Sequence, residues 1–350
     1  MKKLFAMFVL LTLTGAGCAA ATPKTTKADG GVFKTGDVEK GWSQAALVQT
    51  AKGIGTLSTT NILQIEMDPE DNNMLYVGTR EDGFLYSEDA GASWRQPRNK
   101  DLATGLITSV EVSPKDVCTV YVVKGARLYK TTNCMRSFQS DTYVESRANV
   151  RLNRVAVDWF HPDTVWIGLS NGDVQKSNDG GKTWSTSLHA KDAIVDILIS
   201  NADSRSVLVA TAESGIQKTM DGGTTWKSVN DVLRQWDGSR KIYTLVQTNT
   251  SSVIMAASQY GLLRSRDFGS TWDPVNLVTS PGQVEIRALA MNPANGDQIL
   301  YATVGTLYRS SDGGSTWQTS KFPSSRIPRA ALIDPKQSSV LYMGVASETK

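Results

Sequence analysis

Histidine and cysteine are scarce in this 350-residue sequence, which contains two histidines and three cysteines. The sequence has no Cys/His cluster with metal-ligand spacing, no glycine-rich phosphate loop and no nucleophile-elbow motif. These absences argue against a zinc centre, a nucleotide site and a serine hydrolase. We therefore expect no metal, no cofactor and no catalytic residues of these familiar kinds.

An excess of one charge is also missing, since 37 basic residues face 34 acidic ones. No basic run interleaved with aromatic residues stands out, which argues against a nucleic-acid partner. No segment has the length and periodicity of a helix. The apolar run "LFAMFVLLTLT" (4–14) is shorter than the roughly 20 residues that span a bilayer.

That apolar run fits an export signal instead. Lys2 and Lys3 precede it, and "GAGC" after it ends at Cys18. The small residues before Cys18 resemble a lipobox, although Gly15 stands where leucine is usual. We predict a lipoprotein-type signal peptide (1–17), lipidation of Cys18 and a polar tether (18–30), with ordinary cleavage after "AAA" (19–21) as the alternative. The expected location is the bacterial cell envelope, on the periplasmic side of the outer membrane or at the cell surface, with the lipid anchor as the sole membrane contact.

An eight-residue motif recurs along the rest of the chain: Ser/Thr, any residue, Asp, any, Gly, any, Ser/Thr, Trp. Its final aromatic positions are spaced 42 to 46 residues apart, which indicates a repeat architecture. The copies are "SEDAGASW" (87–94), the decayed "TTNCMRSF" (131–138), "SNDGGKTW" (177–184), "TMDGGTTW" (219–226), "SRDFGSTW" (265–272) and "SSDGGSTW" (310–317).

Short strand-like runs fill the space between the motifs, in the order strand A, turn, strand B, turn, strand C, motif, strand D. Radial repetition of such units makes a β-propeller. Seven B-strand runs accompany six motifs, and "GVFKTGDVEKGWSQ" (31–44) aligns with "GLLRSRDFGSTWDP" (261–274) without a gap. We therefore predict an all-β, seven-bladed β-propeller over residues 31–350, with four-stranded antiparallel blades. N-terminal strands C and D (31–35 and 41–46) should join C-terminal strands A and B (330–334 and 339–345).

The repeated carboxylates are expected to be structural. Within a tight turn, the hydroxyl and carboxylate oxygens can accept backbone N–H bonds, glycine can take positive φ and tryptophan can bury its ring. Dispersed copies cannot share one active site. The residues concerned are Asp89, Asp179, Asp221, Asp267 and Asp312.

These repeats resemble the Asp-box, or bacterial neuraminidase repeat, family of seven-bladed propellers. The family includes sialidases, xyloglucan hydrolases with tandem propellers, sortilin-type receptors and photosystem II assembly factors. The stretch "DPEDNNMLYVGTREDGFLYSEDAGASW" (68–94) resembles the sortilin and xyloglucan-hydrolase repeats most. The size of a single propeller and the lipoprotein-like start resemble the exported assembly factors.

Two cysteines remain once Cys18 is assigned to the anchor. Cys118 and Cys134 belong to turns at the same end of the second blade, so a disulfide is feasible, and an oxidising compartment would preserve it. We expect this disulfide to replace the hydrogen bonds that an aspartate would make within the turn of the decayed motif. The alternative is two buried free thiols.

A second resemblance favours catalysis. Sialidases carry Arg-Ile-Pro at the start of an inner strand, where the arginine binds a substrate carboxylate, and Arg326-Ile327-Pro328 occupies an equivalent place. The resemblance implies further arginines, a Tyr–Glu pair and an acid. The candidates are Arg154, Arg287, Glu145, Glu285 and Tyr260.

Alignment of the inner strands on their terminal turns predicts one ring of equivalent positions: Gln64, Ser109, Arg154, Asp196, Thr244, Ala288 and Ala330. Arg154 and Asp196 are then neighbours on adjacent blades. We predict an inter-blade ion pair there, with Arg287, Arg326 and Arg329 forming a basic rim. Trp236, in a long loop (230–241), is a candidate for protein contact or for packing on its own blade.

The sequence therefore predicts a lipid-anchored, non-catalytic scaffold that binds a protein partner or a glycan through this rim. The alternative is a sialidase-like or xyloglucanase-like glycoside hydrolase.

Overall fold

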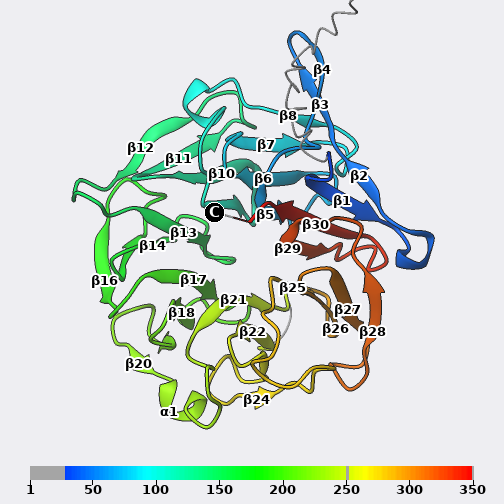
Figure 1. Cartoon of the computed structure of the whole chain (residues 1–350). Coiled ribbons are helices and arrows are strands. Elements are labelled where there is room, and N and C mark those ends of the chain that lie inside the picture. The colour runs from blue at the N-terminus through cyan, green and yellow to red at the C-terminus, as the bar shows by residue number, and fades with distance from the viewer. Residues whose placement is uncertain (1–27, 250–251, 349–350) are drawn as a thin grey trace, which may run out of the picture.

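The computed structural model describes residues 28–249 and 252–348. Seven sheets stand around a central axis, as predicted (Figure 1). We number the blades from the sheet that contains β5. Blades 2 to 6 each contain four consecutive antiparallel strands: β9 (Ser109–Ser113), β10 (Asp116–Lys124), β11 (Arg127–Thr132), β12 (Gln139–Val144); β13 (Leu152–Val157), β14 (Val165–Leu169), β15 (Asp173–Ser177), β16 (Ser185–His189); β17 (Ile194–Ile199), β18 (Val207–Thr211), β19 (Ile216–Thr219), β20 (Lys227–Ser228); β21 (Ile242–Gln247), β22 (Ile254–Ser258), β23 (Leu262–Ser265), β24 (Asp273–Pro274); β25 (Ala288–Asn292), β26 (Asn295–Ala302), β27 (Thr306–Ser310) and β28 (Gln318–Lys321).

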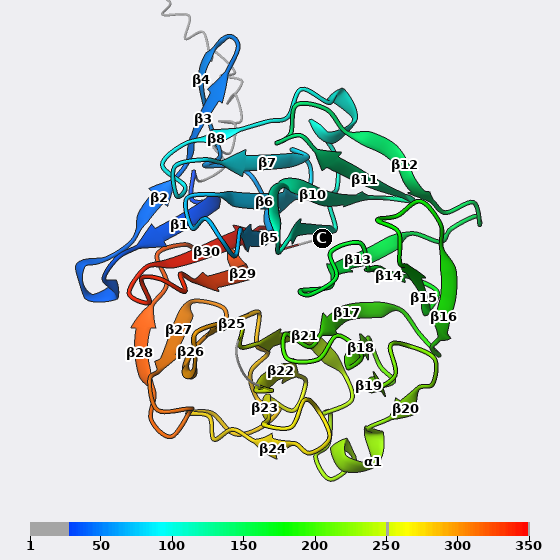
Figure 2. The same cartoon turned by 180° about the vertical axis from the view of Figure 1, so that it is seen from behind.

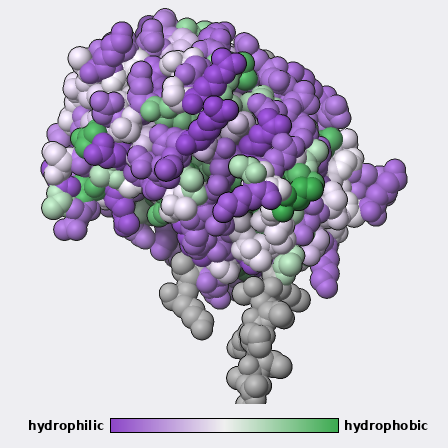
Figure 3. Space-filling view, turned by 90° about the horizontal axis from the view of Figure 1, so that it is seen from above, coloured by the Kyte–Doolittle hydropathy of each residue, from purple (hydrophilic) through white to green (hydrophobic). Residues whose placement is uncertain are grey.

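The hydrophobic core lies between the blades. The second strands have neighbouring blades on both faces, and every residue of β14, β18 and β22 is buried. One apolar cluster, for example, joins Leu208 and Ala210 of blade 4 to Ile254 and Ala256 of blade 5. Seen edge-on, the outer surface is mostly hydrophilic with small separate hydrophobic patches (Figure 3).

Blade 7 closes the ring as predicted. β1 (Gly31–Thr35) lies between β30 (Leu341–Ala346) and β2 (Ser43–Ala45), and β29 (Ile327–Ile333) forms the inner strand. Five residue pairs register β1 against β30, from Gly31 opposite Val345 to Thr35 opposite Leu341. The chain is anchored slightly before β1, because the Asp29 carbonyl and carboxylate accept hydrogen bonds from Ser324 and Ser325.

Blade 1 is larger than the repeat predicts. Beside β5 (Ile62–Met67), β6 (Leu75–Thr79), β7 (Phe84–Ser87) and β8 (Trp94–Arg95), it has a hairpin of β3 (Leu47–Thr50) and β4 (Gly53–Thr56). β3 pairs in parallel with β8, and the hairpin projects beyond the ring in both views (Figures 1 and 2). The Trp94 indole N–H donates to the Ala45 carbonyl over 2.8 Å. This bond from β8 to β2 therefore fastens blade 1 to blade 7.

The Asp-box aspartates hold their own turns together through hydrogen bonds. Oδ1 of Asp221 accepts from the Thr219 hydroxyl and the Thr225 backbone N–H, at 2.7 and 2.8 Å, and Oδ2 accepts from the Thr225 hydroxyl at 2.6 Å. Gly223 takes φ of +90°, and Trp226 packs edge-on against Trp166 of the preceding blade. The hydroxyl and backbone bonds from Thr225 lower the pKa of Asp221 to about 2. The same i,i+4 bonds recur at Asp89, Asp179, Asp267 and Asp312.

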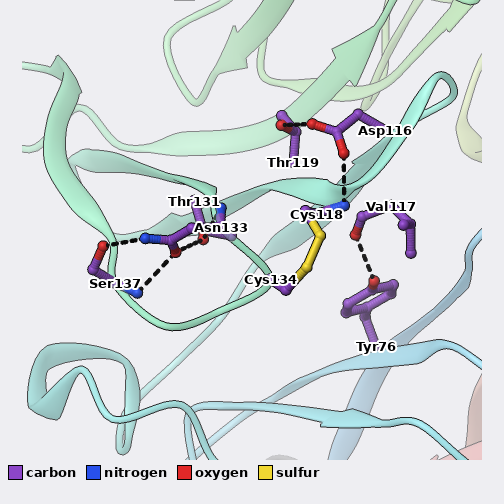
Figure 4. Close-up of a disulfide and its surroundings, with 9 residues drawn as sticks. All are labelled: Tyr76, Asp116, Val117, Cys118, Thr119, Thr131, Asn133, Cys134 and Ser137. Carbon is purple, nitrogen blue, oxygen red and sulfur yellow. Dashed lines mark hydrogen bonds between the residues drawn. A yellow bond between two sulfur atoms is a disulfide. The ribbon is translucent and has the colours of Figure 1, made fainter.

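The decayed motif of blade 2 keeps the hydrogen bonds within its turn, contrary to expectation. Asn133 Oδ1 accepts from the Thr131 hydroxyl and the Ser137 N–H, each at 3.0 Å, as an Asp-box carboxylate would. The structure also joins the sulfurs of Cys118 and Cys134, which links the start of β10 to this turn (Figure 4). The bond is therefore an addition to the hydrogen-bonded turn, because the asparagine amide oxygen preserves the acceptor.

The described residues contain very little helix. A four-residue helix, α1 (Asn230–Leu233), and two 3-10 turns (Val38–Lys40 and Lys100–Leu102) interrupt the loops. Over residues 28–249 and 252–348, no helix is long and apolar enough to cross a membrane. The predicted signal peptide and Cys18 lie outside the described residues.

Candidate functional site

The inner strands of all seven blades surround a central channel of about 780 Å³. These strands converge on the axis (Figure 1), and residues from each of them line the channel. The pairing of each inner strand with the second strand of its blade confirms the predicted equivalent positions. In five blades the predicted residue comes directly after an irregularity in this pairing: Gln64, Arg154, Asp196, Thr244 and Ala330. In the other two blades, Ser109 and Ala288 pair with the equivalent residue of the second strand.

The predicted ion pair is present, with Arg154 Nε 3.1 Å from Asp196 Oδ1. Arg154 Nε also donates to the Val195 carbonyl, over 3.3 Å. Oδ2 of Asp196 accepts from the Leu245 N–H at 2.8 Å and the Thr244 hydroxyl at 3.1 Å. One carboxylate thus connects the inner strands of blades 3, 4 and 5.

Two further carboxyl groups in the channel escaped the sequence analysis. Glu66 and Glu111 lie two residues beyond Gln64 and Ser109 on their strands, and both line the channel. Burial raises the pKa of Glu66 to about 7, although Arg154 opposes the change. Burial and the nearby Glu66 also raise the pKa of Glu111 well above its usual range. A single guanidinium therefore faces three carboxyl groups, which favours retention of a proton among them.

This arrangement predicts a stability loss with rising pH. The pKa of Glu66 is higher in the folded chain than in the unfolded one, so its contribution is complete below about pH 4.5 and is lost as pH rises through about 7. Glu66→Gln removes the ionisation, so we expect its melting temperature to exceed that of the wild type at pH 8 and to match it near pH 5. Thermal melts across this range test the prediction, and an equal gain at both pH values would contradict it.

At one mouth of the channel, one arginine has no counter-ion. Arg287 pairs with Glu285 at 2.7 Å and Lys241 with Glu213 at 3.0 Å, but Arg329 forms no ion pair with any described carboxylate. The Nε atoms of Arg287 and Arg329 are buried without a hydrogen-bond partner in the described chain. Burial, followed by repulsion from Arg287, lowers the pKa of Arg329. This mouth therefore carries two guanidinium groups, of which that of Arg329 has no described carboxylate partner.

Arg326 does not belong to that exposed rim. Its Nη1 donates to the Thr59 carbonyl and to Asn61 Oδ1, at 2.9 and 3.1 Å, while its Nε lies 3.4 Å from Asp29 Oδ1. Only 12% of its side chain is exposed. The arginine ties the N-terminal segment to blade 1, which corrects its proposed place in the rim and removes the basis for a sialidase-like arginine.

The other residues proposed for a sialidase-like site are dispersed. Glu145 lies at the end of β12, outside the channel lining, where Arg147 and the Tyr143 hydroxyl bind its carboxylate. The hydrogen bonds from Arg147 lower the pKa of Glu145 to about 2. Tyr260 packs near Trp236, their ring centroids 6.2 Å apart, and both lie against the core of blades 4 and 5.

Known families share this architecture. The model of the family described as "Photosynthesis system II assembly factor YCF48" matches residues 185–323. A protein of Neosartorya fischeri, described as a probable oligoxyloglucan-reducing end-specific xyloglucanase, is 27% identical over 209 residues, which cover 50% of this chain and 24% of the relative. The resemblance to Asp-box propellers of both kinds is confirmed.

Solved structures show the same fold. A GH74 xyloglucanase from Xanthomonas campestris superposes with a TM-score of 0.68 at 16% identity, over 82% of this chain and 51% of that one. A structure described as "YCF48 bound to D1 peptide" gives 0.63 at 16% identity, over 83% of this chain and 94% of that one. This chain thus spans about half the length of the xyloglucanase structure and nearly all of the YCF48 structure.

Proposed function

We propose that this chain is an exported, non-catalytic scaffold that binds an acidic protein segment at the channel mouth. The observation that carries the proposal is the presence of Arg287 and Arg329 together in the channel lining, where Arg329 forms no ion pair with a described carboxylate. A guanidinium presents its donors in a fixed fork that matches a carboxylate. In this proposal Arg154 and Asp196 hold the channel wall, and the partly buried Trp236, outside the channel lining, offers a separate contact surface.

The comparisons support a scaffold in one respect. One of the similar structures, described as YCF48, was solved bound to a peptide, which supports a peptide as the ligand class of this proposal. Tethering through Cys18 would keep such a scaffold at the bacterial envelope, and the oxidising environment there would maintain the Cys118–Cys134 bond.

A glycoside hydrolase remains the second candidate, favoured by the raised pKa values of Glu66 and Glu111. A carboxyl group that keeps its proton near neutral pH can act as a general acid, and an ionised partner can act as base or nucleophile. In this second proposal the channel would receive a carbohydrate end.

Binding and turnover separate the two candidates. We expect a fluorescein-labelled hexaglutamate peptide to bind the wild type at low ionic strength, and Arg287→Gln/Arg329→Gln to weaken binding by at least about tenfold, since a charge-assisted bidentate contact is lost. Arg205→Gln, an exposed arginine paired with Asp203, is the matched control and should bind as the wild type does.

The opposite outcome identifies an enzyme. Turnover of xyloglucan oligosaccharides or aryl sialosides that disappears in Glu66→Gln, together with equal peptide affinity in the double arginine variant and the wild type, would refute the scaffold.

A further inference from the structure

Residues 347 and 348, which follow β30, lie at the same end of blade 7 as the start of β29, the strand that carries Arg329. β30 ends at Ala346, near the centre of the ring (Figures 1 and 2). Ser347 is then held in place: its N–H and hydroxyl both donate to Asn61 Oδ1, at 2.7 and 3.0 Å, and Arg80 donates to its carbonyl at 3.1 Å.

The anchor for this segment is itself fixed. The amide nitrogen of Asn61 donates to both carboxylate oxygens of Glu81, at 3.2 and 3.0 Å, and Arg326 donates to its amide oxygen at 3.1 Å. Asn61 therefore cannot turn its amide without losing bonds on both sides. The position of Ser347 is set by the wall of blade 1.

An acidic residue follows directly. Glu348 is exposed. Ala346 pairs with Ile327 and Val345 with Pro328, so Glu348 lies just past the end of β30, next to the start of the strand that carries Arg329. Glu285 also lines this part of the channel. Glu285, however, is already bound to Arg287 over 2.7 Å. Glu348 forms no ion pair with a described cation, so it is the available carboxylate at the end of the sheet that carries Arg329. Its charge also opposes the lowering of the Arg329 pKa.

We propose that Arg329 is a carboxylate-binding site and that Glu348 of the same chain competes for it with an acidic partner segment. This inference rests on the proposed function of the mouth. Ser347 keeps Glu348 at a high local concentration without filling the channel, so the competition lowers partner affinity instead of abolishing binding. A partner that presents several carboxylates displaces Glu348, whereas one with a single carboxylate gains little.

The test measures binding of the labelled hexaglutamate peptide to the whole chain at low ionic strength. Glu348→Gln removes one charge at a partly screened mouth, so binding should tighten about three- to tenfold. Glu70→Gln is the matched control: the same charge is removed from an exposed glutamate in the turn after β5, at the opposite end of the inner strand, and affinity should stay at the wild-type value.

A double variant tests whether the two residues act together. In the Arg329→Gln background, Glu348→Gln should bring at most a small further change, because the competition needs the arginine. Equal tightening with and without Arg329 would overturn the competition and leave a general charge effect.

Two results overturn the inference in different ways. If Glu348→Gln binds like the wild type while the double arginine variant still weakens binding, the competitor is wrong and the proposed function stands. If neither the wild type nor Glu348→Gln binds the peptide, the proposed function fails together with the inference.

Discussion

Removal of residues 30–46 is expected to abolish the cooperative thermal unfolding of the chain. The deletion strips β1 and β2 from blade 7, which leaves the long edge of β30 unpaired and removes Val32 and Phe33 from two inter-blade clusters. It also removes the Ala45 carbonyl that accepts the Trp94 indole bond. Circular dichroism melts monitor the result.

Deletion of residues 19–27 is the control. It leaves Asp29 and its bonds to Ser324 and Ser325 in place, so the melting temperature should change little. The prediction would be wrong if the variant lacking residues 30–46 unfolded as cooperatively as this control and within a few degrees of its melting temperature. That result would show that blades 1 to 6 keep their fold without ring closure.

Arg154→Ala is expected to lower the free energy of unfolding by about 3 to 5 kcal/mol near neutral pH, because it leaves Asp196 in the channel wall without its cation. The substitution also removes the positive charge that favours ionised Glu66 and Glu111. The decrease in unfolding free energy should therefore be smaller in acid, where both glutamates hold their protons. Denaturant titrations of the two single variants and of Arg154→Ala/Asp196→Ala measure the coupling.

The exposed pair of Arg205 and Asp203 provides the comparison, with 75% and 41% of the two side chains exposed. Its coupling should not exceed about 1 kcal/mol. Additive effects of the Arg154 and Asp196 substitutions would show that the channel pair contributes no more than an exposed one.

Most of the ring could be predicted because one local pattern fixes it. Each Asp-box turn joins two adjacent strands of its blade, so the spacing of Trp184, Trp226 and Trp272 counts blades directly. The hairpin of β3 and β4 was missed for the same reason. Its "LVQTAKGIGT" pattern reads as two strands about a turn, but a four-stranded template has no place for it, and its pairing with β8 is set by tertiary contact.

The channel was harder to predict than the ring. Alignment of inner strands found Arg154 and Asp196, since equivalent positions on neighbouring blades come together around an axis. Glu66 and Glu111 had a signal, an acidic residue within the apolar runs "ILQIEM" and "SVEVS", but it was not used. Arg326 was misplaced because its partners, Asp29 and Asn61, come from segments distant in sequence.

The composition of blade 7 also determines the order in which strands can pair as the chain is synthesised. A ribosome makes β1 before its partner, and β1 cannot pair with β30 until residue 341 and those after it exist. β3 finds β8 much sooner, once residue 95 has been made. The parallel pairing of β3 with β8 can therefore hold the N-terminal strands beside the growing ring, and the seam between the first and last blades is the last part of the molecule to close.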